Sequence, residues 1–483
     1  MKGQEAAPLW EALKAHVRTG YAGFHVPGHK GRYIPAELYA AWGPAVFAYD
    51  LTELPGLDNL HAPEGPIKEA QRLAAELYGA RHTFFLVGGT SAGLIASLLA
   101  VTKPGDKVLL PRFAHRSLLA ATILGDLRPL FYPAAVDPVC GLVCGWDQAE
   151  AARIIREHTD ARALVLVHPT YHGLVGPAAE LIQDAQKAGL TVIADEAHGP
   201  HFYFHSDFPA GALALGVDAA VQSTHKLLGS FTQSSWLHIG SERISPEPVA
   251  EALRWLESSS PSYLLMASLD LARRQAALTG ARDWGRASKL AQELRQALAA
   301  VPNLEVWPNN DRFQVKEQDP CKITVYVGRL GVTGPQAAFY LQEKHRIQVE
   351  LVGFNTLLLI ITPADNEETI RRVVSAMKDL AAKYRATGTA PSAVPPLPAV
   401  PVRISPREAA FSQKSYLSLS EAVGKIAAQA LVPYPPGVPA IWPGEEFTVE
   451  VAEVLNRYVR LGIPVQGLNA DAGTEPHLLV VEE

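Results

Sequence analysis

The sequence predicts an α/β protein that is built around a mostly parallel β-sheet. From about residue 65 to residue 240, short apolar runs alternate with segments of helical periodicity. The apolar runs are too short for helices and are typical of strands that are buried on both faces. Strands and helices that alternate in this way form parallel sheets covered by helices. Because such sheets bind ligands beyond the carboxyl ends of their strands, we expect the functional site there.

The expected elements of this region follow one another regularly along the chain. We expect strands at 83–87, 107–110, 163–167, 191–194 and 219–222. We expect helices at 66–78, 92–101, 146–159 and 178–188. A long helix at 262–298 follows them.

Two further units are expected after this region. The first is a smaller α/β unit, with strands at 304–307, 322–327, 348–351 and 357–361 and helices at 334–343 and 367–384. Residues 386–405 are dominated by Pro, Ala and small residues, which is typical of a linker. The last unit has an expected helix at 417–430. The expected domains are therefore 1–64, 65–285, 286–385, the linker 386–405, and 406–483.

Composition excludes several classes of protein. The 483 residues are 48 % hydrophobic and 19 % charged, which is typical of a globular chain and not of a disordered one. The net charge of −6 argues against a nucleic-acid partner. No apolar run approaches the roughly 18 residues of a membrane span, and no apolar leader precedes Glu11. Three cysteines fit a reducing compartment, so we expect a soluble, cytoplasmic protein.

Two residues that follow apolar runs could carry chemistry. Lys226, in QSTHK, directly follows one run, and burial there would lower the pKa of its amine and suit it to form a Schiff base. A surface lysine at the end of a strand is the alternative. Asp195, in VIADEAHG, could pair with a cationic ring nitrogen, or it could cap the N-terminus of a helix.

Two further motifs, a glycine-rich turn and a histidine, could also carry chemistry. VGGTSAG at 87–93 joins an expected strand to a helix, and free N–H groups with the helix dipole form an anion site at such a turn. His115, in PRFAHRS, could stack on a flat cofactor or be a solvated loop residue. Each signal is weak alone. Their order along the chain, however, matches the phosphate anchor, ring face, ring nitrogen and aldehyde carbon of a pyridoxal-phosphate (PLP) site.

Longer motifs of the chain are more specific. They are FHVPGHKGR (24–32), DLTELPGLDNLHAPEG (50–65), HPTYHGLVG (168–176), QSTHKLLGS (222–230) and EAVGKIAAQALVPYPPGVPAIWPGE (421–445). With these motifs the sequence resembles the bacterial ornithine/lysine/arginine decarboxylase family, in its compact form without a large N-terminal wing. The resemblance implies a PLP-dependent transferase fold of the aspartate aminotransferase type (fold type I), with PLP bound by the large domain 65–285 and a C-terminal decarboxylase domain at 406–483.

The resemblance also implies a role for each matching residue. Lys226 forms the Schiff base with PLP, Asp195 keeps the pyridine nitrogen protonated, and His198 lies close to the cofactor. Glu445 meets the distal cation of the substrate, although an exposed turn glutamate is an adequate alternative. The remaining cofactor contacts are the ring-stacking His115 and, around the phosphate, Gly89, Thr90, Ser91, Ser223 and His225.

Two local features bear on the reaction. Larger family members often have Ser-Ala-Trp after the aspartate, whereas this chain has Glu196, Ala197 and His198, as in the compact branch. The strand that carries a carboxylate-binding arginine in related aminotransferases corresponds to 355–363, which contains no arginine. An unpaired carboxylate is destabilised in apolar surroundings and relieved by leaving as CO₂. The resemblance therefore favours a decarboxylase.

The expected substrate is a small basic amino acid. Arginine is favoured, giving agmatine for polyamine synthesis, and lysine or ornithine comes next. A carboxylate such as Glu445, Asp58 or Glu64 would bind its cation. A PLP-dependent aminotransferase and a non-catalytic PLP-fold regulatory protein are the alternatives.

The last expectations from the sequence concern the oligomeric state and metal binding. Family members are homodimers or dimers of dimers whose active sites lie at the subunit interface, and SFTQSS (230–235) resembles a segment near that interface. No metal is expected, because Cys140 and Cys144 lack a second ligand pair at zinc spacing. His201 and His205 lack the glutamate of an HExxH motif.

Overall fold

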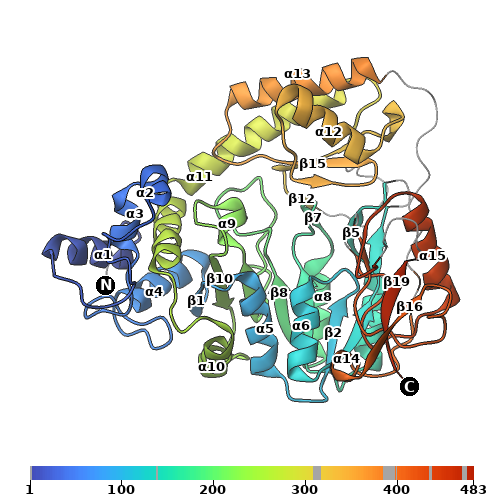
Figure 1. The fold of residues 1–483 in the computed structure, drawn as a ribbon, viewed down its shortest axis with the longest axis horizontal. Coiled ribbons are helices and arrows are strands. Elements are labelled where there is room, and N and C mark those ends of the chain that lie inside the picture. Colours follow the sequence, from blue (N-terminus) through green and yellow to red (C-terminus); the bar gives the residue numbers. More distant parts are fainter. Residues whose placement is uncertain are drawn as a thin grey trace. The chain divides into compact units, whose positions relative to one another are not determined.

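A computed structural model describes most of the chain. The described residues are 3–137, 140–307, 317–384, 398, 400–434, 438–469 and 476–482. They form two compact units, each assembled from segments that are distant in the sequence (Figure 1). Unit 1 comprises 1–101, 191–206 and 210–282, and unit 2 comprises 102–190, 207–209 and 283–483.

Unit 1 contains four neighbouring strands in the order β1-β10-β9-β8. β8 (Thr191–Asp195) and β9 (Ala219–Gln222) are parallel. β10 (Ser235–Ile239) is antiparallel to β9 and to β1 (His82–Leu86). Since β10 runs in the opposite direction, β1, β9 and β8 end at the edge where β10 begins.

The helices of unit 1 cover this sheet and build the N-terminal segment. α5 approaches the sheet closely because Gly93 has no side chain: a Cβ there would lie 2.5 Å from Val221 Cγ1. Residues of α1, α4, β1 and α11 share a core that includes Leu13, Ile67, Phe85 and Tyr263. The helices are α1 (Pro8–Thr19), α2 (Ala36–Trp42), α3 (Pro44–Tyr49), α4 (Pro66–Tyr78), α5 (Gly89–Val101), α9 (Thr224–Leu227), α10 (Pro246–Leu256) and α11 (Tyr263–Ala299), of which α11 continues into unit 2.

Unit 2 begins with three parallel strands in the order β6-β2-β3. A short antiparallel pair, β4 with β5, follows β3, and β7 pairs with β12. The elements of this part are β2 (Lys107–Pro111), α6 (Arg116–Gly125), β3 (Arg128–Tyr132), β4 (Ala134–Val136), β5 (Val143–Trp146), α7 (Gln148–Glu157), β6 (Ala163–Val167), β7 (Leu174–Val175), α8 (Ala178–Lys187) and β12 (Glu317–Gln318).

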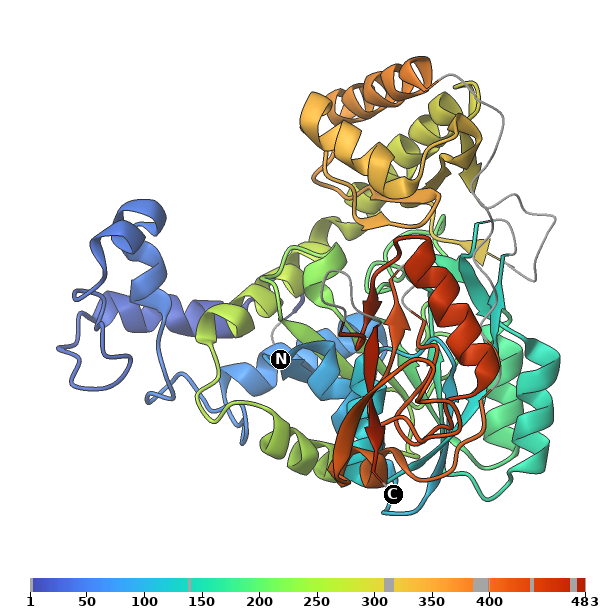
Figure 2. The same ribbon diagram turned by 45° about the vertical axis from the view of Figure 1, so that its right-hand side comes forward.

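A second sheet of unit 2 is antiparallel, with the order β11-β13-β15-β14. Figure 2 shows α12 and α13, in orange, on the same side of β15. The elements are β11 (Glu305–Trp307), β13 (Lys322–Tyr326), the 3₁₀ helix η1 (Gly328–Leu330), α12 (Gly334–His345), β14 (Leu351–Val352), β15 (Thr356–Ile360) and α13 (Glu367–Lys383).

The C-terminal part of unit 2 is built from short strand pairs and two helices. β16 pairs with β19 and β17 pairs with β18, around a core that includes Leu419, Phe447, Leu455 and Leu478. The elements are α14 (Pro406–Phe411), β16 (Lys414–Ser418), β17 (Val432–Pro433), α15 (Val449–Arg460), β18 (Val465–Gln466) and β19 (His477–Val481).

Most expected elements of the 65–240 region are confirmed, including all five strands. The long helix, the strands at 304–307, 322–327 and 357–361, and both helices of the smaller unit are also confirmed. The expected strand at 348–351 is wrong, because β14 begins only at its last residue. Most of the expected linker, residues 386–397 and 399, lies outside the described residues.

The expected helix at 417–430 is wrong. Its first residues belong to β16, and Gly424 has a φ of +83°, which ends any right-handed helix. The following backbone groups bond to distant chain segments: Ala427 N–H donates to Glu445 O, and Ala428 N–H donates to Leu479 O. Tertiary pairing has therefore overridden the helical propensity of this alanine-rich stretch.

Candidate active site

Three hydroxyl groups meet at the edge of the unit 1 sheet where β1 and β9 end. Thr90 Oγ1 lies 2.7 Å from Ser223 Oγ and donates to Ser235 Oγ over 3.2 Å. All three side chains are buried. They meet because Thr90 follows β1, Ser223 follows β9, and Ser235 opens the antiparallel β10. The expected phosphate contacts Thr90 and Ser223 are thus brought together.

Ser235 was not among the expected residues. The signal that could have identified it is the apolar run WLHIG directly after it, which is typical of a further strand. Its place beside Thr90 depends on that strand being antiparallel, which spacing alone does not reveal.

The glycine-rich turn brings backbone donors to the same place. Gly89 has a φ of +75°, a left-handed conformation that favours glycine. It begins α5, so Thr90 and the half-buried Ser91 lie in the first turn of this helix. The first N–H groups of a helix have no partner within it and, with the helix dipole, bind anions. The turn and the three hydroxyls together suit a phosphate group.

Lys226 contacts His198. Lys226 Nζ lies 3.1 Å from His198 Nε2, and His198 is 6 % exposed. An ammonium can only donate, so Nε2 is the acceptor and the proton of the neutral imidazole resides on Nδ1. A proton can therefore pass between these two nitrogens.

Of the two alternatives for Lys226, an exposed lysine at the end of a strand is the one observed in the single chain. Lys226 is exposed, whereas Thr224 and Leu227 are buried. The cause is the one-turn helix α9, in which residues three apart share a face. Thr224 and Leu227 occupy the inner face, so Lys226 points away from it.

His225 is oriented by the backbone. Its Nδ1 lies 2.8 Å from Ser234 O, and a carbonyl only accepts, so Nδ1 carries a proton. Burial lowers the pKa of His225, as does Lys226, against the hydrogen bond to Ser234. The remaining nitrogen, Nε2, donates to a phosphate only when the ring is doubly protonated.

Asp195 and Glu196 have different surroundings although they are adjacent. Asp195 is the last residue of β8, and its Oδ1 accepts from Ala197 N at 3.2 Å. Glu196 is fully buried and accepts from Ala212 N at 2.6 Å, from Tyr203 Oη and from Gln222 Nε2 at 2.7 Å. Burial raises the pKa of Glu196 to about 7, against these hydrogen bonds.

A chain of hydrogen bonds extends from Glu196 across the four strands. Gln222 Nε2 donates to Glu196, and Gln222 Oε1 accepts from His238 Nε2 at 3.1 Å. Thr83 Oγ1 then donates to His238 Nδ1 at 2.7 Å. Burial lowers the pKa of His238 to about 3, so its ring is neutral and this direction of donation is the consistent one. The Glu196 side chain thus lies inside the protein.

Two expected site residues belong to unit 2. His115 is exposed and caps α6: its Nδ1 accepts from Ser117 N at 3.3 Å. Glu445 is 1 % exposed, so it is not an exposed turn residue. Its carboxylate forms a bidentate ion pair with Arg112, and Oε2 also accepts from Trp442 N at 2.7 Å. Arg112 in turn lies over the ring of Phe131.

Asp58 and Glu64, the other carboxylates considered for the substrate's cation, both belong to unit 1 and differ in how available they are for a substrate. Asp58 accepts from the backbone N–H groups of Glu64, Gly65 and Ile67 and so holds the start of α4. The side chain of Glu64 is exposed.

The two cysteines that were considered as metal ligands can be placed in the structure. Cys140 and Cys144 are buried, and Cys140 Sγ lies 3.1 Å from Asp137 Oδ1. Burial raises the pKa of both thiols, that of Cys144 to about 12. Within the described residues, no group of three or more His, Cys, Asp or Glu side chains is placed to hold a metal ion. Nor does any described helix combine the length and apolarity that a bilayer span requires.

Comparisons with known proteins identify the family of this chain. A family model described as the Orn/Lys/Arg decarboxylase major domain matches residues 7–316, and a model of the C-terminal domain of the same family matches 395–462. The chain belongs to the Orn/Lys/Arg decarboxylase family. The resemblance inferred from the sequence motifs is confirmed.

Among curated members of this family, an arginine decarboxylase of Bacillus anthracis is 36 % identical over 472 residues, covering 96 % of this chain and 95 % of the relative. An arginine decarboxylase of Bacillus subtilis is also 36 % identical, covering 96 % of each chain. An inducible lysine decarboxylase of Escherichia coli is 24 % identical, covering 96 % of this chain and 79 % of the relative.

Solved structures show the fold of this family member. A lysine decarboxylase of Francisella novicida superposes with a TM-score of 0.87 at 20 % identity, covering 99 % of this chain and 81 % of that one. An alanine–glyoxylate aminotransferase of Nostoc superposes with a TM-score of 0.54 at 20 % identity, covering 70 % and 92 %. The expected fold class, PLP fold type I with a C-terminal decarboxylase domain, is confirmed.

Glu196 should make stability depend on pH. Its pKa is raised from 4.5 to about 7 in the folded chain, so between these values the folded chain holds more protons than the unfolded one. Its contribution is therefore present below about pH 4.5 and is lost as the pH rises through about 7, which amounts to about 3 kcal/mol. We expect Glu196→Gln to remove this part of the pH dependence, measured by urea unfolding at pH 5 and pH 8. Exposed Glu293→Gln is the control, and an unchanged pH dependence in Glu196→Gln would contradict the assignment.

The Arg112–Glu445 pair should stabilise unit 2. Glu445→Ala leaves a largely buried guanidinium without its carboxylate, and we expect a loss of about 3–5 kcal/mol in urea unfolding. The neighbouring pair Arg403–Glu446 is more exposed, with 57 % and 26 % exposed side chains. Glu446→Ala should therefore cost only about 0–1 kcal/mol. Equal losses in the two variants would show that Arg112 is not held by Glu445.

Proposed function

We propose that this chain is a PLP-dependent carboxy-lyase that removes CO₂ from a basic amino acid. The observation that carries the proposal is the meeting, at one edge of the unit 1 sheet, of an amine beside an imidazole and a cluster of three hydroxyls. Asp195 ends β8 of the same sheet. Membership of the Orn/Lys/Arg decarboxylase family supports the same reaction.

The residues present fit PLP. The first turn of α5 with Thr90, Ser223 and Ser235 would hold the phosphate, and the Asp195 carboxylate would keep a proton on the ring nitrogen. Lys226 would supply the amine that reacts with the cofactor's aldehyde, and the family resemblance assigns the ring-stacking role to His115. The bound cofactor supplies an electron-accepting ring that stabilises the negative charge left at the substrate's Cα.

The proton that Cα takes up after decarboxylation would come from a nitrogen atom of this chain. After CO₂ leaves, Cα needs a proton from a nearby acid. Lys226 Nζ and His198 Nε2, 3.1 Å apart, are the two candidates for the donor, and each can be reloaded by the other.

Arginine is the favoured substrate, with lysine or ornithine next. The Bacillus anthracis and Bacillus subtilis relatives described above, each 36 % identical, are named arginine decarboxylases, and they align with nearly the whole chain. Residues 355–363 contain no arginine, which favours decarboxylation over amino transfer. The exposed Glu64 is available for the substrate's distal cation, whereas Glu445 would first have to exchange Arg112 for it. The agmatine formed would enter polyamine synthesis, in the cytoplasm.

A homodimer is proposed because apolar side chains gather on the N-terminal segment. Figure 2 shows this segment of unit 1, in dark blue, extending outward from α1 and α4. Its exposed side chains include Phe24 at 92 % and Tyr33 at 89 %, together with Tyr21, Val26, Tyr39 and Trp42. A concentration of exposed apolar side chains in one segment favours an interaction surface there. Phe231, in the SFTQSS segment, is also exposed, and a second copy of the chain would cover both surfaces.

The reaction is tested by CO₂ release from arginine, lysine and ornithine with added PLP. We expect release from one of them, with arginine fastest, and a fall of about 1,000-fold or more in Lys226→Ala. Lys68→Ala, which alters an exposed lysine of α4, is the control and should keep full activity. Amino transfer to a keto acid without CO₂ release would instead identify an aminotransferase.

The dimer is tested by Phe24→Asp. A symmetric interface loses two buried phenylalanines, each worth about 2 kcal/mol, so the dimer dissociation constant should rise about 1,000-fold. Sedimentation equilibrium measures this change. Phe339→Asp, which alters an exposed phenylalanine of α12, should leave the dimer intact. If Phe24→Asp sediments as the unaltered protein does, the N-terminal segment is not at the interface.

A further inference from the structure

The Glu257 carboxylate binds the backbone of the glycine-rich turn. It directly follows α10, and its side chain is largely buried, at 8 % exposed. Its Oε2 accepts from Val87 N at 3.2 Å, and the Gly88 N–H also donates to this carboxylate. These are the two residues between β1 and α5. The carboxylate therefore binds the turn directly, one and two residues before Gly89.

The rest of the turn is built around this contact. A Cβ on Gly88 would lie 3.2 Å from Glu257 Oε2, so a side chain there would press on the carboxylate. From another element, the Gln233 side chain donates to Val87 O. The turn is thus held at both N–H groups by Glu257 and at a carbonyl by Gln233. The N–H groups of the first turn of α5 remain available for an anion.

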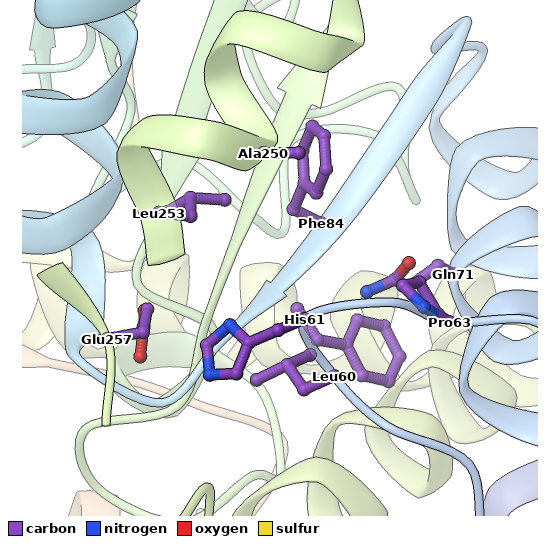
Figure 3. A pocket seen from close by; sticks show the side chains of 9 residues that line it. Leu60, His61, Pro63, Gln71, Phe84, Ala250, Leu253 and Glu257 are labelled. Carbon is purple, nitrogen blue, oxygen red and sulfur yellow. The ribbon is translucent and has the colours of Figure 1, made fainter. Parts of the chain in front are cut away.

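A small pocket lies beside the Glu257 side chain. Oε1 is buried and has no hydrogen-bond partner among the described residues, and the same is true of Gln71 Nε2. Both side chains line a pocket of about 40 Å³ in unit 1, with Glu257 and Gln71 on opposite sides of His61 (Figure 3). A volume of this size holds two or three water molecules. The other lining residues are Leu60, Pro63, Phe84, Phe85, Ala250 and Leu253.

We propose that Glu257 is a positioning residue for the phosphate of the cofactor. Through the Val87 and Gly88 N–H groups it fixes the turn from which Gly89 and Thr90 reach the phosphate, without touching the cofactor itself. The inference rests on the proposed PLP-dependent function. In the sequence, Glu257 lies at least 30 residues away from every expected phosphate contact.

The protonated form of Glu257 suits this role. A phosphate dianion beside the turn disfavours a second negative charge behind it, whereas the neutral acid still accepts the two N–H groups through Oε2. Its proton then lies on Oε1, the oxygen that has no hydrogen-bond partner among the described residues. Burial raises the pKa of Glu257 to about 7, against the Gly88 and Val87 N–H groups, so protonation is accessible near neutrality.

The neighbours of Glu257 carry few charges. α5 contains no charged residue, β1 contributes Phe84 and Phe85 to the pocket, and α4 contributes Gln71. The loop before α4 contributes His61, whose Nε2 lies 2.8 Å from Ser258 O. His61 is the other titratable side chain among the pocket's lining residues, so a pH series includes His61→Gln.

The experiment compares PLP with pyridoxal, which lacks the phosphate, in titrations of the cofactor-free protein. We expect Glu257→Ala to raise the dissociation constant of PLP about tenfold or more and to leave that of pyridoxal within twofold. Glu251→Ala, an exposed glutamate on the same helix, should change neither. Equal weakening of both ligands, or no weakening of either, would overturn the inference.

A second variant keeps the test decisive if Glu257→Ala does not fold. Glu257→Gln resembles the protonated acid, with one oxygen for the N–H groups and an amide in place of the protonated oxygen. Its PLP affinity should match the unaltered protein at pH 6 and exceed it at pH 8, and His61→Gln should not reproduce this difference. An affinity ratio that does not change with pH would overturn the inference. Failure of the unaltered protein to bind PLP would overturn the proposed function, and the inference with it.

Discussion

The direction of four strands governs the chemistry of unit 1. β1, β9 and β8 end at one edge of their sheet, and β10 begins there because it runs the opposite way. Residues from three distant chain segments, Thr90, Ser223 and Ser235, therefore bring their hydroxyls together. The glycine-rich turn and Lys226 come after strands that end at this edge, and Asp195 is the last residue of another such strand.

Buried polar groups support that edge from within. The chain Thr83–His238–Gln222–Glu196 crosses all four strands, and every donor in it meets an acceptor. A fully satisfied network of this kind specifies one register of the strands, because a shift of one residue would leave each group unpaired in a low dielectric. Glu257 is also a buried carboxyl group, and it binds backbone N–H groups of the glycine-rich turn. Both carboxyl groups have raised pKa values, and burial is the cause in each case.

The sequence was most informative where structure is local. The strands and helices of 65–240 could be recognised because each has its own periodicity and because turn residues separate them. Lys226 and Asp195 could be singled out because each comes at the end of an apolar run, Thr90 because it lies in the glycine-rich turn, and Ser223 through the resemblance to the family. Sequence reasoning was wrong at 417–430, where a helical pattern exists but the backbone bonds to Glu445 and Leu479 instead. It left open whether Lys226 is buried, and the outer face of the one-turn helix α9 exposes this residue.

The sequence by itself determined the family, the fold class and most candidate site residues, because these depend on residue types at fixed short spacings. The tertiary structure decided which of these residues meet. It placed Ser235 beside Thr90, turned Glu196 inward, paired Glu445 with Arg112, and brought Glu257 to the glycine-rich turn. The physical reason is that such contacts join positions far apart in the chain, where strand direction and burial, not spacing, set the distance between two side chains.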